Sequence, residues 1–211
     1  MNETTLHYVY DPLCGWCYGA APLLKAAAAI PELRIELHAG GLWLGGRRQA
    51  MGQALRDYVR PHDERIQALT GQPFGERYFN ELLLRDGLLL DSEQPIRAIL
   101  AVTALGGNGL SLLHRIQQSH YRDGIWIGSL EHLTCLAAEQ NIGADDFVKA
   151  YQQADLASHL ADSQRWMRHL GGQGYPTLGL VQGDKVTPLS ASSFLGEPEA
   201  FARQIQLMMS R

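Results

Sequence analysis

The sequence DPLCGWCYG, residues 11–19, holds two of the three cysteines of this chain, and the prediction of its fold starts there. It follows a short β-prone run, LHYVY at residues 6–10, and precedes an alanine-rich run typical of a helix. Free backbone N–H groups and the positive end of the dipole at a helix start favour an anion, so we expect Cys14 to ionise readily. Cys17 lies one helical turn later, within reach of a disulfide with Cys14.

A C-x-x-C pair between a strand and a helix is typical of a thioredoxin-like redox motif. The thiolate is the form that attacks disulfides, so Cys14 is the predicted nucleophile and Cys17 the predicted resolving thiol. Two other interpretations are half of a zinc site and a pair of buried thiols. A zinc site normally needs four ligands at characteristic spacings, and no second C-x-x-C or C-x-x-H occurs, so we expect no metal.

Composition limits the partners and the compartment. The chain has 211 residues, of which 45% are hydrophobic, enough for one substantial core. Its formal net charge of −4 argues against binding to nucleic acid or to an anionic membrane. The N-terminal residues lack the pattern of a secretory signal, and no run approaches the ~18 apolar residues of a membrane span. These features predict a cytoplasmic protein, in which disulfides are usually transient and catalytic.

Strand and helix patterns divide the chain into two predicted units. Residues 1–45 and 170–211 have the order strand–helix–strand, then strand–strand–helix, and residues 46–169 form a helical insertion that must fold back as a unit. Strands are predicted at residues 6–10, 33–38, 178–181 and 185–189, and flanking helices at 14–30, kinked at Pro22, and 198–209. Helical runs in the insertion are 51–59, 62–69, 96–105, 110–121, 130–139, 145–153 and 157–169, with N-caps at Ser92, Asn108 and Ser129.

These features together resemble the DsbA family of thioredoxin-fold proteins. The resemblance rests on Cys14-Gly15-Trp16-Cys17, on the helical insertion, and on Gly174-Tyr175-Pro176-Thr177 before a strand, and it covers most of the chain. It implies an α/β, thioredoxin-like fold with a large helical insertion. Pro176 matches the cis-proline that packs beside the cysteine pair in this superfamily. Residues 120–147 are similar to the insertion of cytosolic, FrnE-like thiol isomerases.

The resemblance also implies an activity, that of a thiol–disulfide oxidoreductase of the reductase or isomerase type. The reaction would pass through a mixed disulfide on Cys14, with protein or small-molecule disulfides and thiols as partners. The Tyr175 backbone would pair with an extended substrate, next to Thr177. Trp16 either offers this substrate an apolar contact or folds over the helix start. No cofactor is expected beyond the redox-active disulfide, with glutathione or another thiol system as the electron donor.

Three positions depart from the family pattern. The dipeptide Gly-Trp replaces the Pro-His of the DsbA oxidant, so no histidine cation lies between the cysteines. Tyr8 occupies the place of a buried acid that helps to move protons in family members. Cys135 stands alone, and the apolar pattern around it predicts a buried structural thiol. His7 is the histidine next to the motif that we consider for proton transfer.

Two functions from other classes share this architecture. One is a glutathione-dependent transferase or isomerase of the kappa type, including the 2-hydroxychromene-2-carboxylate isomerases, which typically carry serine at the nucleophile position. The pair Cys14 and Cys17 argues against it. The other is a non-catalytic adaptor that uses the fold to bind partners.

Overall fold

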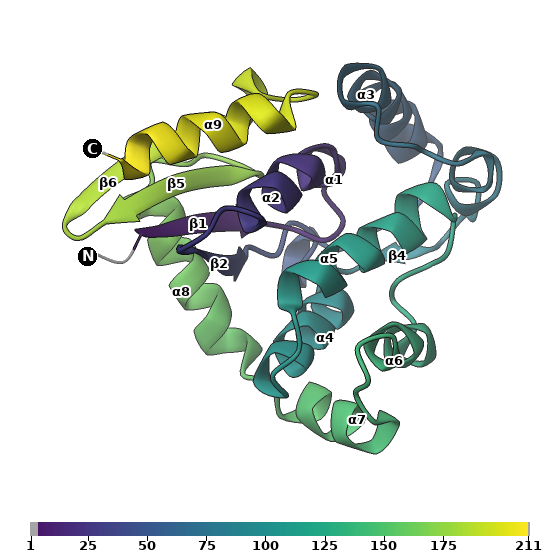
Figure 1. Cartoon of the computed structure of the whole chain (residues 1–211). Coiled ribbons are helices and arrows are strands. Elements are labelled where there is room, and N and C mark those ends of the chain that lie inside the picture. Colours follow the sequence, from purple (N-terminus) through teal and green to yellow (C-terminus); the bar gives the residue numbers. More distant parts are fainter. Residues whose placement is uncertain (1–3, 211) are drawn as a thin grey trace.

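A four-stranded sheet forms the centre of the computed structural model, which describes residues 4–210 (Figure 1). Its order is β2-β1-β5-β6, and its strands are β1 (Thr4–Tyr10), β2 (Leu33–Ala39), β5 (Thr177–Gln182) and β6 (Lys185–Leu189). β1 runs parallel to β2 and antiparallel to β5, which in turn pairs antiparallel with β6. The four predicted strands are confirmed. Residues 1–3 and 211 of the predicted first unit lie outside the described residues.

Different helices cover the two faces of this sheet (Figure 1). The helices α1 (Gly15–Gly19), α2 (Ala21–Ala28) and α9 (Pro198–Met209) lie on one face, and α8 (Leu156–His169) packs against β1 and β2 on the other. Side chains of β1 alternate between these faces. Tyr8 reaches the backbone of Cys17 in α1, whereas His7 stacks on Trp166 of α8. β1 therefore separates two buried environments, and only one of them contains the cysteine pair.

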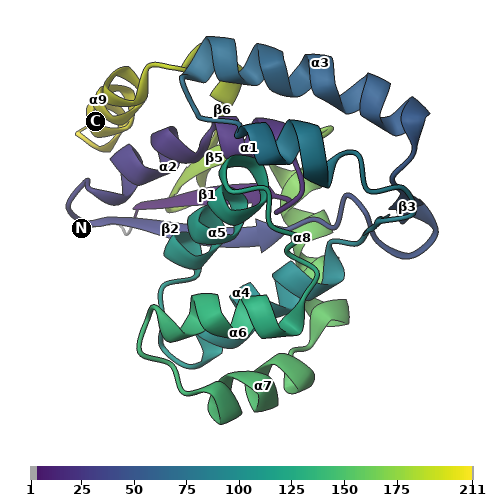
Figure 2. The same cartoon turned by 90° about the vertical axis from the view of Figure 1, so that its right-hand side faces the viewer.

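The insertion helices lie beside the sheet, where Figures 1 and 2 show them as a second layer of the molecule. Their bounds are α3 Gln53–Thr70, α4 Glu93–Ala104, α5 Gly109–Gln117, α6 Leu130–Ala138 and α7 Ala144–Gln153, with a small antiparallel pair of β3 Gln49–Ala50 and β4 Leu89–Leu90. Asn108 and Ser129 cap α5 and α6 as predicted, since each side chain accepts a backbone N–H of the first turn. None of the helices within residues 4–210 is both long enough and apolar enough to cross a membrane.

The effects of two prolines differ from the sequence prediction. Residues 14–30 form two helices rather than one kinked helix, and Pro22 lies in the first turn of α2, where its missing N–H has no partner to lose. Residues 51–69 form the single helix α3 rather than two runs, although Pro61 lies inside it. Leu55 and Ile66 both face the core, so the buried stripe stays in phase across the exposed proline.

The prediction of a buried Cys135 is wrong. This thiol is exposed on α6, whereas Leu133 and Leu136 on the same helix are buried. Side chains two positions apart on an α-helix differ in direction by a rotation of about 200°, so Cys135 and Leu133 point to opposite sides of α6. The apolar run around Cys135 is one-sided, and the thiol lies on its solvent face.

We therefore expect Cys135→Ser to change the free energy of unfolding by less than about 0.5 kcal/mol, because the substituted atom makes no core contacts. Urea unfolding of the variant and of the native protein measures this difference. A loss of about 2 kcal/mol would contradict the exposed position.

Candidate active site

The two cysteines of the motif lie where β1 delivers the chain to α1, and both are free thiols. Cys14 is the N-cap residue of α1 and is 7% exposed, whereas Cys17 is 0% exposed. The segment at Tyr175 packs against the Cys14 sulfur and keeps this residue mostly buried, but Cys14 is still the more accessible of the two cysteines. Burial raises the pKa of the Cys17 thiol well above its usual range, and the neighbouring Cys14 adds to this effect.

The loop before β5 forms the second wall of the site. The Tyr175–Pro176 peptide bond is cis, and the Cys14 thiol donates a hydrogen bond to the Tyr175 carbonyl, with 3.6 Å between sulfur and oxygen. The Tyr175 ring lies against Gly40, where a Cβ would come within 2.1 Å of the ring, so any larger residue there would have to displace this ring. The Thr177 hydroxyl donates to the Gly174 carbonyl over 2.8 Å and so closes the loop on itself.

A cavity of about 520 Å³ opens beside this loop. Its lining includes all three predicted substrate-binding residues, Trp16, Tyr175 and Thr177, together with Pro176. Trp16 is half-buried, packs against the core and also lines the cavity, so it can offer a substrate an apolar contact. The structure therefore places Trp16, Tyr175, Pro176 and Thr177 around one cavity, with Cys14 in contact with Tyr175. The volume lies in the range of small-molecule sites in proteins.

Asp11 is a site residue that the sequence reasoning missed. Its side chain is fully buried and accepts hydrogen bonds from the Leu13 N–H at 2.8 Å, the Ser92 hydroxyl at 3.0 Å and the Leu42 N–H at 2.6 Å. Its own carbonyl accepts the Cys14 N–H at 3.2 Å. Burial raises the pKa of Asp11 to about 6, against the effect of these hydrogen bonds. A buried acid therefore lies three residues before Cys14, although Tyr8 occupies the position at which family members carry such an acid. The short distance in sequence between Asp11 and Cys14 was the signal that could have identified Asp11.

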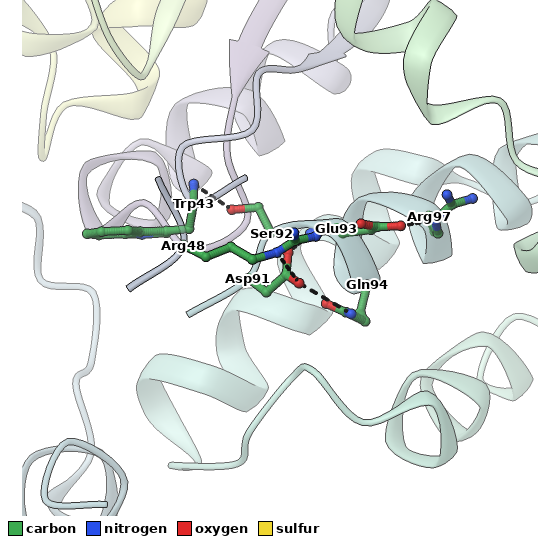
Figure 3. A network of polar contacts seen from close by, with 7 residues as sticks. All are labelled: Trp43, Arg48, Asp91, Ser92, Glu93, Gln94 and Arg97. Atoms are coloured by element: carbon green, nitrogen blue, oxygen red, sulfur yellow. Dashed lines mark hydrogen bonds and ion pairs between the residues drawn. The ribbon is translucent and has the colours of Figure 1, made fainter. Parts of the chain in front are cut away.

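Ser92 extends this arrangement into the insertion (Figure 3). Its hydroxyl accepts the Trp43 N–H at 3.1 Å while donating to Asp11, so one side chain joins the cysteine loop to the start of α4. Next to it, the Arg48 guanidinium donates to Asp91 at 2.7 Å and to Glu93 at 2.8 Å, as Figure 3 shows. Ser92 is the N-cap residue of α4, as predicted, but its side chain accepts no N–H of that helix.

A second buried acid lies on the insertion side of the cysteine loop. Asp63 of α3 accepts a hydrogen bond from the Tyr78 hydroxyl at 2.6 Å, and its other oxygen faces Gly15. A Cβ at residue 15 would lie 2.5 Å from that oxygen, so glycine lets α3 approach the cysteine pair closely. Burial raises the pKa of Asp63 to about 7.

We expect Asp63 to make stability depend on pH. An unfolded carboxyl ionises near 3.8, and the folded one near 7, so between these values the folded state binds the extra proton and stability falls as pH rises. The contribution is up to about 1.4 kcal/mol per pH unit. Asp63→Asn should remove this part of the slope in urea unfolding between about pH 4.5 and 6.5. Parallel slopes for the two proteins would contradict the assignment.

His7 lies away from the cysteines. It projects from the α8 face of β1, where its ring stacks on Trp166 with 3.6 Å between centroids, and it is buried. The hypothesis that His7 transfers protons to the cysteine pair is therefore wrong. Alternation along the strand places its neighbour Tyr8, instead, on the cysteine face.

Comparison with known proteins finds solved structures that are similar to this chain over nearly its whole length. No protein-family model and no curated protein sequence matches the chain. The cytosolic disulfide reductase DsbM from Pseudomonas aeruginosa is 42% identical, with a TM-score of 0.89 and 98% of both chains covered. Its structure with GSH is 41% identical, with a TM-score of 0.88, and covers 98% of this chain and 100% of that one.

More distant structures share the fold. A candidate protein disulfide isomerase from Nitrosomonas europaea is 21% identical, with a TM-score of 0.80 and 98% of both chains covered. A 2-hydroxychromene-2-carboxylate isomerase is 16% identical, with a TM-score of 0.60 and 98% of both chains covered. The similarity to the disulfide reductase extends over nearly the whole chain, and its sequence identity of 42% is well above the 21% and 16% of these two structures. The chain belongs to the DsbA family of thioredoxin-fold oxidoreductases and is a disulfide oxidoreductase.

Proposed function

We propose that this protein is a cytoplasmic disulfide reductase in which Cys14 attacks the substrate, Cys17 resolves the mixed disulfide, and glutathione supplies the electrons. The observation that carries the proposal is the position of the Cys14 sulfur, 3.6 Å from the carbonyl of Tyr175, a residue that lines a cavity of about 520 Å³, with Cys17 fully buried. The name of the 42% identical relative, a cytosolic disulfide reductase, supports both the direction and the compartment.

The proposed cycle transfers two electrons from glutathione to the substrate. The Cys14 thiolate attacks one sulfur of the substrate disulfide, and the other sulfur leaves as a thiolate. The Cys17 thiolate then attacks the Cys14 sulfur, releases the second substrate thiolate and forms the Cys14–Cys17 disulfide. One glutathione thiolate opens this disulfide at Cys14 and frees Cys17. A second glutathione takes the first from Cys14 as glutathione disulfide and restores the dithiol.

The surroundings of the sulfurs suit these steps. Because burial raises the pKa of Cys17, this thiol stays protonated until a neighbouring base takes its proton. Asp11 is the nearby buried carboxyl, with its pKa raised to about 6, and it lies within the same loop. The cavity beside Tyr175 and Pro176 has the size for a small thiol peptide, and the serine hydroxyls at Ser190 and Ser192 give it polar groups. The GSH-bound structure of the related reductase supports glutathione as this ligand.

A coupled assay tests the proposal. With glutathione, glutathione reductase and NADPH, the protein should accelerate reduction of 2-hydroxyethyl disulfide and of insulin, and Cys14→Ser should not. Measured next to it, conjugation of glutathione to 1-chloro-2,4-dinitrobenzene tests the transferase alternative. Conjugation without disulfide reduction would overturn the proposal, and absence of both activities would favour an adaptor.

A further inference from the structure

Three metal-binding side chains converge on the face of the sheet opposite the cysteines. They are His7 of β1 and Glu36 and His38 of β2, and their ligand atoms all lie within 4.8 Å of one another. His7 Nδ1 lies 2.9 Å from His38 Nε2 and 3.5 Å from Glu36 Oε2. The strand register explains the cluster, because His7 pairs with Glu36 and Val9 with His38, so all three side chains point to the α8 side.

We propose that His7, Glu36 and His38 bind a divalent transition-metal ion, with Zn²⁺ as the preferred ion, between β1, β2 and α8. Two imidazoles and one carboxylate are a ligand set typical of zinc, with a fourth position left for water. Zn–N bonds of about 2.0–2.1 Å place two nitrogens of a tetrahedral site roughly 3.3 Å apart. The two histidines therefore need to separate by only a few tenths of an ångström. This site departs from the expectation of no metal, which considered the cysteines alone.

The hydrogen bonding within the cluster also favours an ion. His7 Nδ1 lies close to both His38 Nε2 and Glu36 Oε2, so these three atoms can share only one proton in a hydrogen bond. A metal ion placed among them would serve all three at once, with His7 taking the tautomer that keeps its proton on Nε2.

Groups around the cluster orient these ligands. Asp162 of α8 lies 3.8 Å from the other nitrogen of His38, the position from which a carboxylate fixes the ring of a metal-bound histidine. Arg34 pairs with Glu36 Oε1 at 3.3 Å and leaves Oε2 directed at His7. Glu36 is 34% exposed, so an ion can enter from the solvent edge, while Trp166 covers the His7 ring on the inner side.

Calorimetric titration of the full chain with Zn²⁺ tests the site. Because the C-x-x-C thiols also bind zinc, the titration uses Cys14→Ser/Cys17→Ser protein. We expect one ion per chain, bound more weakly by about tenfold or more in Glu36→Gln and lost in His38→Gln. Asp162→Asn, a positioning variant, should weaken binding about tenfold. His169→Gln is the matched control, because His169 contacts the same Trp166 but lies outside the cluster, and it should bind within about twofold of the parent.

Quenching of Trp166 fluorescence by Cu²⁺ gives a second measurement in the same proteins, since the indole stacks directly on His7. If His38→Gln folds poorly, the Glu36→Gln variant still tests the site, because this substitution changes only a half-exposed side chain. The proposal is overturned by the absence of binding at about millimolar Zn²⁺, by equal affinity in Glu36→Gln, or by loss of binding in His169→Gln.

Discussion

Cys17→Ser will accumulate a mixed disulfide between Cys14 and its substrate, and Cys14→Ser will accumulate none. Cys14 is the more accessible cysteine and contacts the carbonyl of Tyr175, which lines the cavity, whereas Cys17 is completely buried. A substrate sulfur can therefore reach Cys14 but not Cys17, and only Cys17 is placed to release the adduct. Both variants should lose at least about 1000-fold in reductase turnover, because each removes a covalent partner of the cycle.

Non-reducing gels and mass mapping after incubation with an oxidised protein or with glutathione disulfide measure this trapping. The adduct should map to Cys14 and disappear on reduction. Cys135→Ser serves as the matched control, because it removes the remaining thiol of the chain from the solvent face of α6, and it should retain full turnover. Equal trapping by both active-site variants would show that the roles are not divided in this way.

Asp11→Ala will destabilise the protein by about 3 kcal/mol and will reduce turnover as well. The carboxylate accepts three hydrogen bonds, which come from the cysteine loop, from the loop after β2 and from α4. Alanine leaves these buried donors without a partner, at about 1–3 kcal/mol each, and part of this loss is offset by relief from burying a charge. Turnover should fall because the Asp11 carboxylate holds the cysteine loop through the Leu13 N–H and is a buried acid whose charge acts on the Cys17 thiol.

Chemical denaturation and the coupled reductase assay measure the two effects separately. Ser92→Ala removes one of the three donors and should cost about 1 kcal/mol with a smaller effect on turnover. Asp184→Ala, in the exposed turn between β5 and β6, is the control for loss of an acidic side chain and should change stability by less than about 0.5 kcal/mol. If Asp11→Ala proved as stable as the Asp184 variant, the role of Asp11 in joining the three segments would be refuted.

Patterns within a few residues were sufficient to predict most of the secondary structure. The helix Pro198–Met209 and the strand Lys185–Leu189 have the predicted bounds, because a proline at one helix start and a Gly-containing turn before the strand determine them locally. The position of Cys14 at a helix start is equally local. The single helix kinked at Pro22 and the two separate helical runs at 51–59 and 62–69 were predicted wrongly, because the effect of a proline depends on which helix face the core buries.

The sequence by itself determined the candidate redox residues, since the spacing of Cys14 and Cys17 and the Tyr-Pro-Thr segment are properties of short stretches. Only the tertiary structure decided what surrounds them. Asp11 becomes a buried acid because residues 42 and 92 supply its donors, and Asp63 meets Gly15 because α3 packs on α1. His7 meets its partners Glu36 and His38 only through the pairing of β1 with β2. Burial and partners of a polar group depend on residues distant in the chain, and no local pattern contains them.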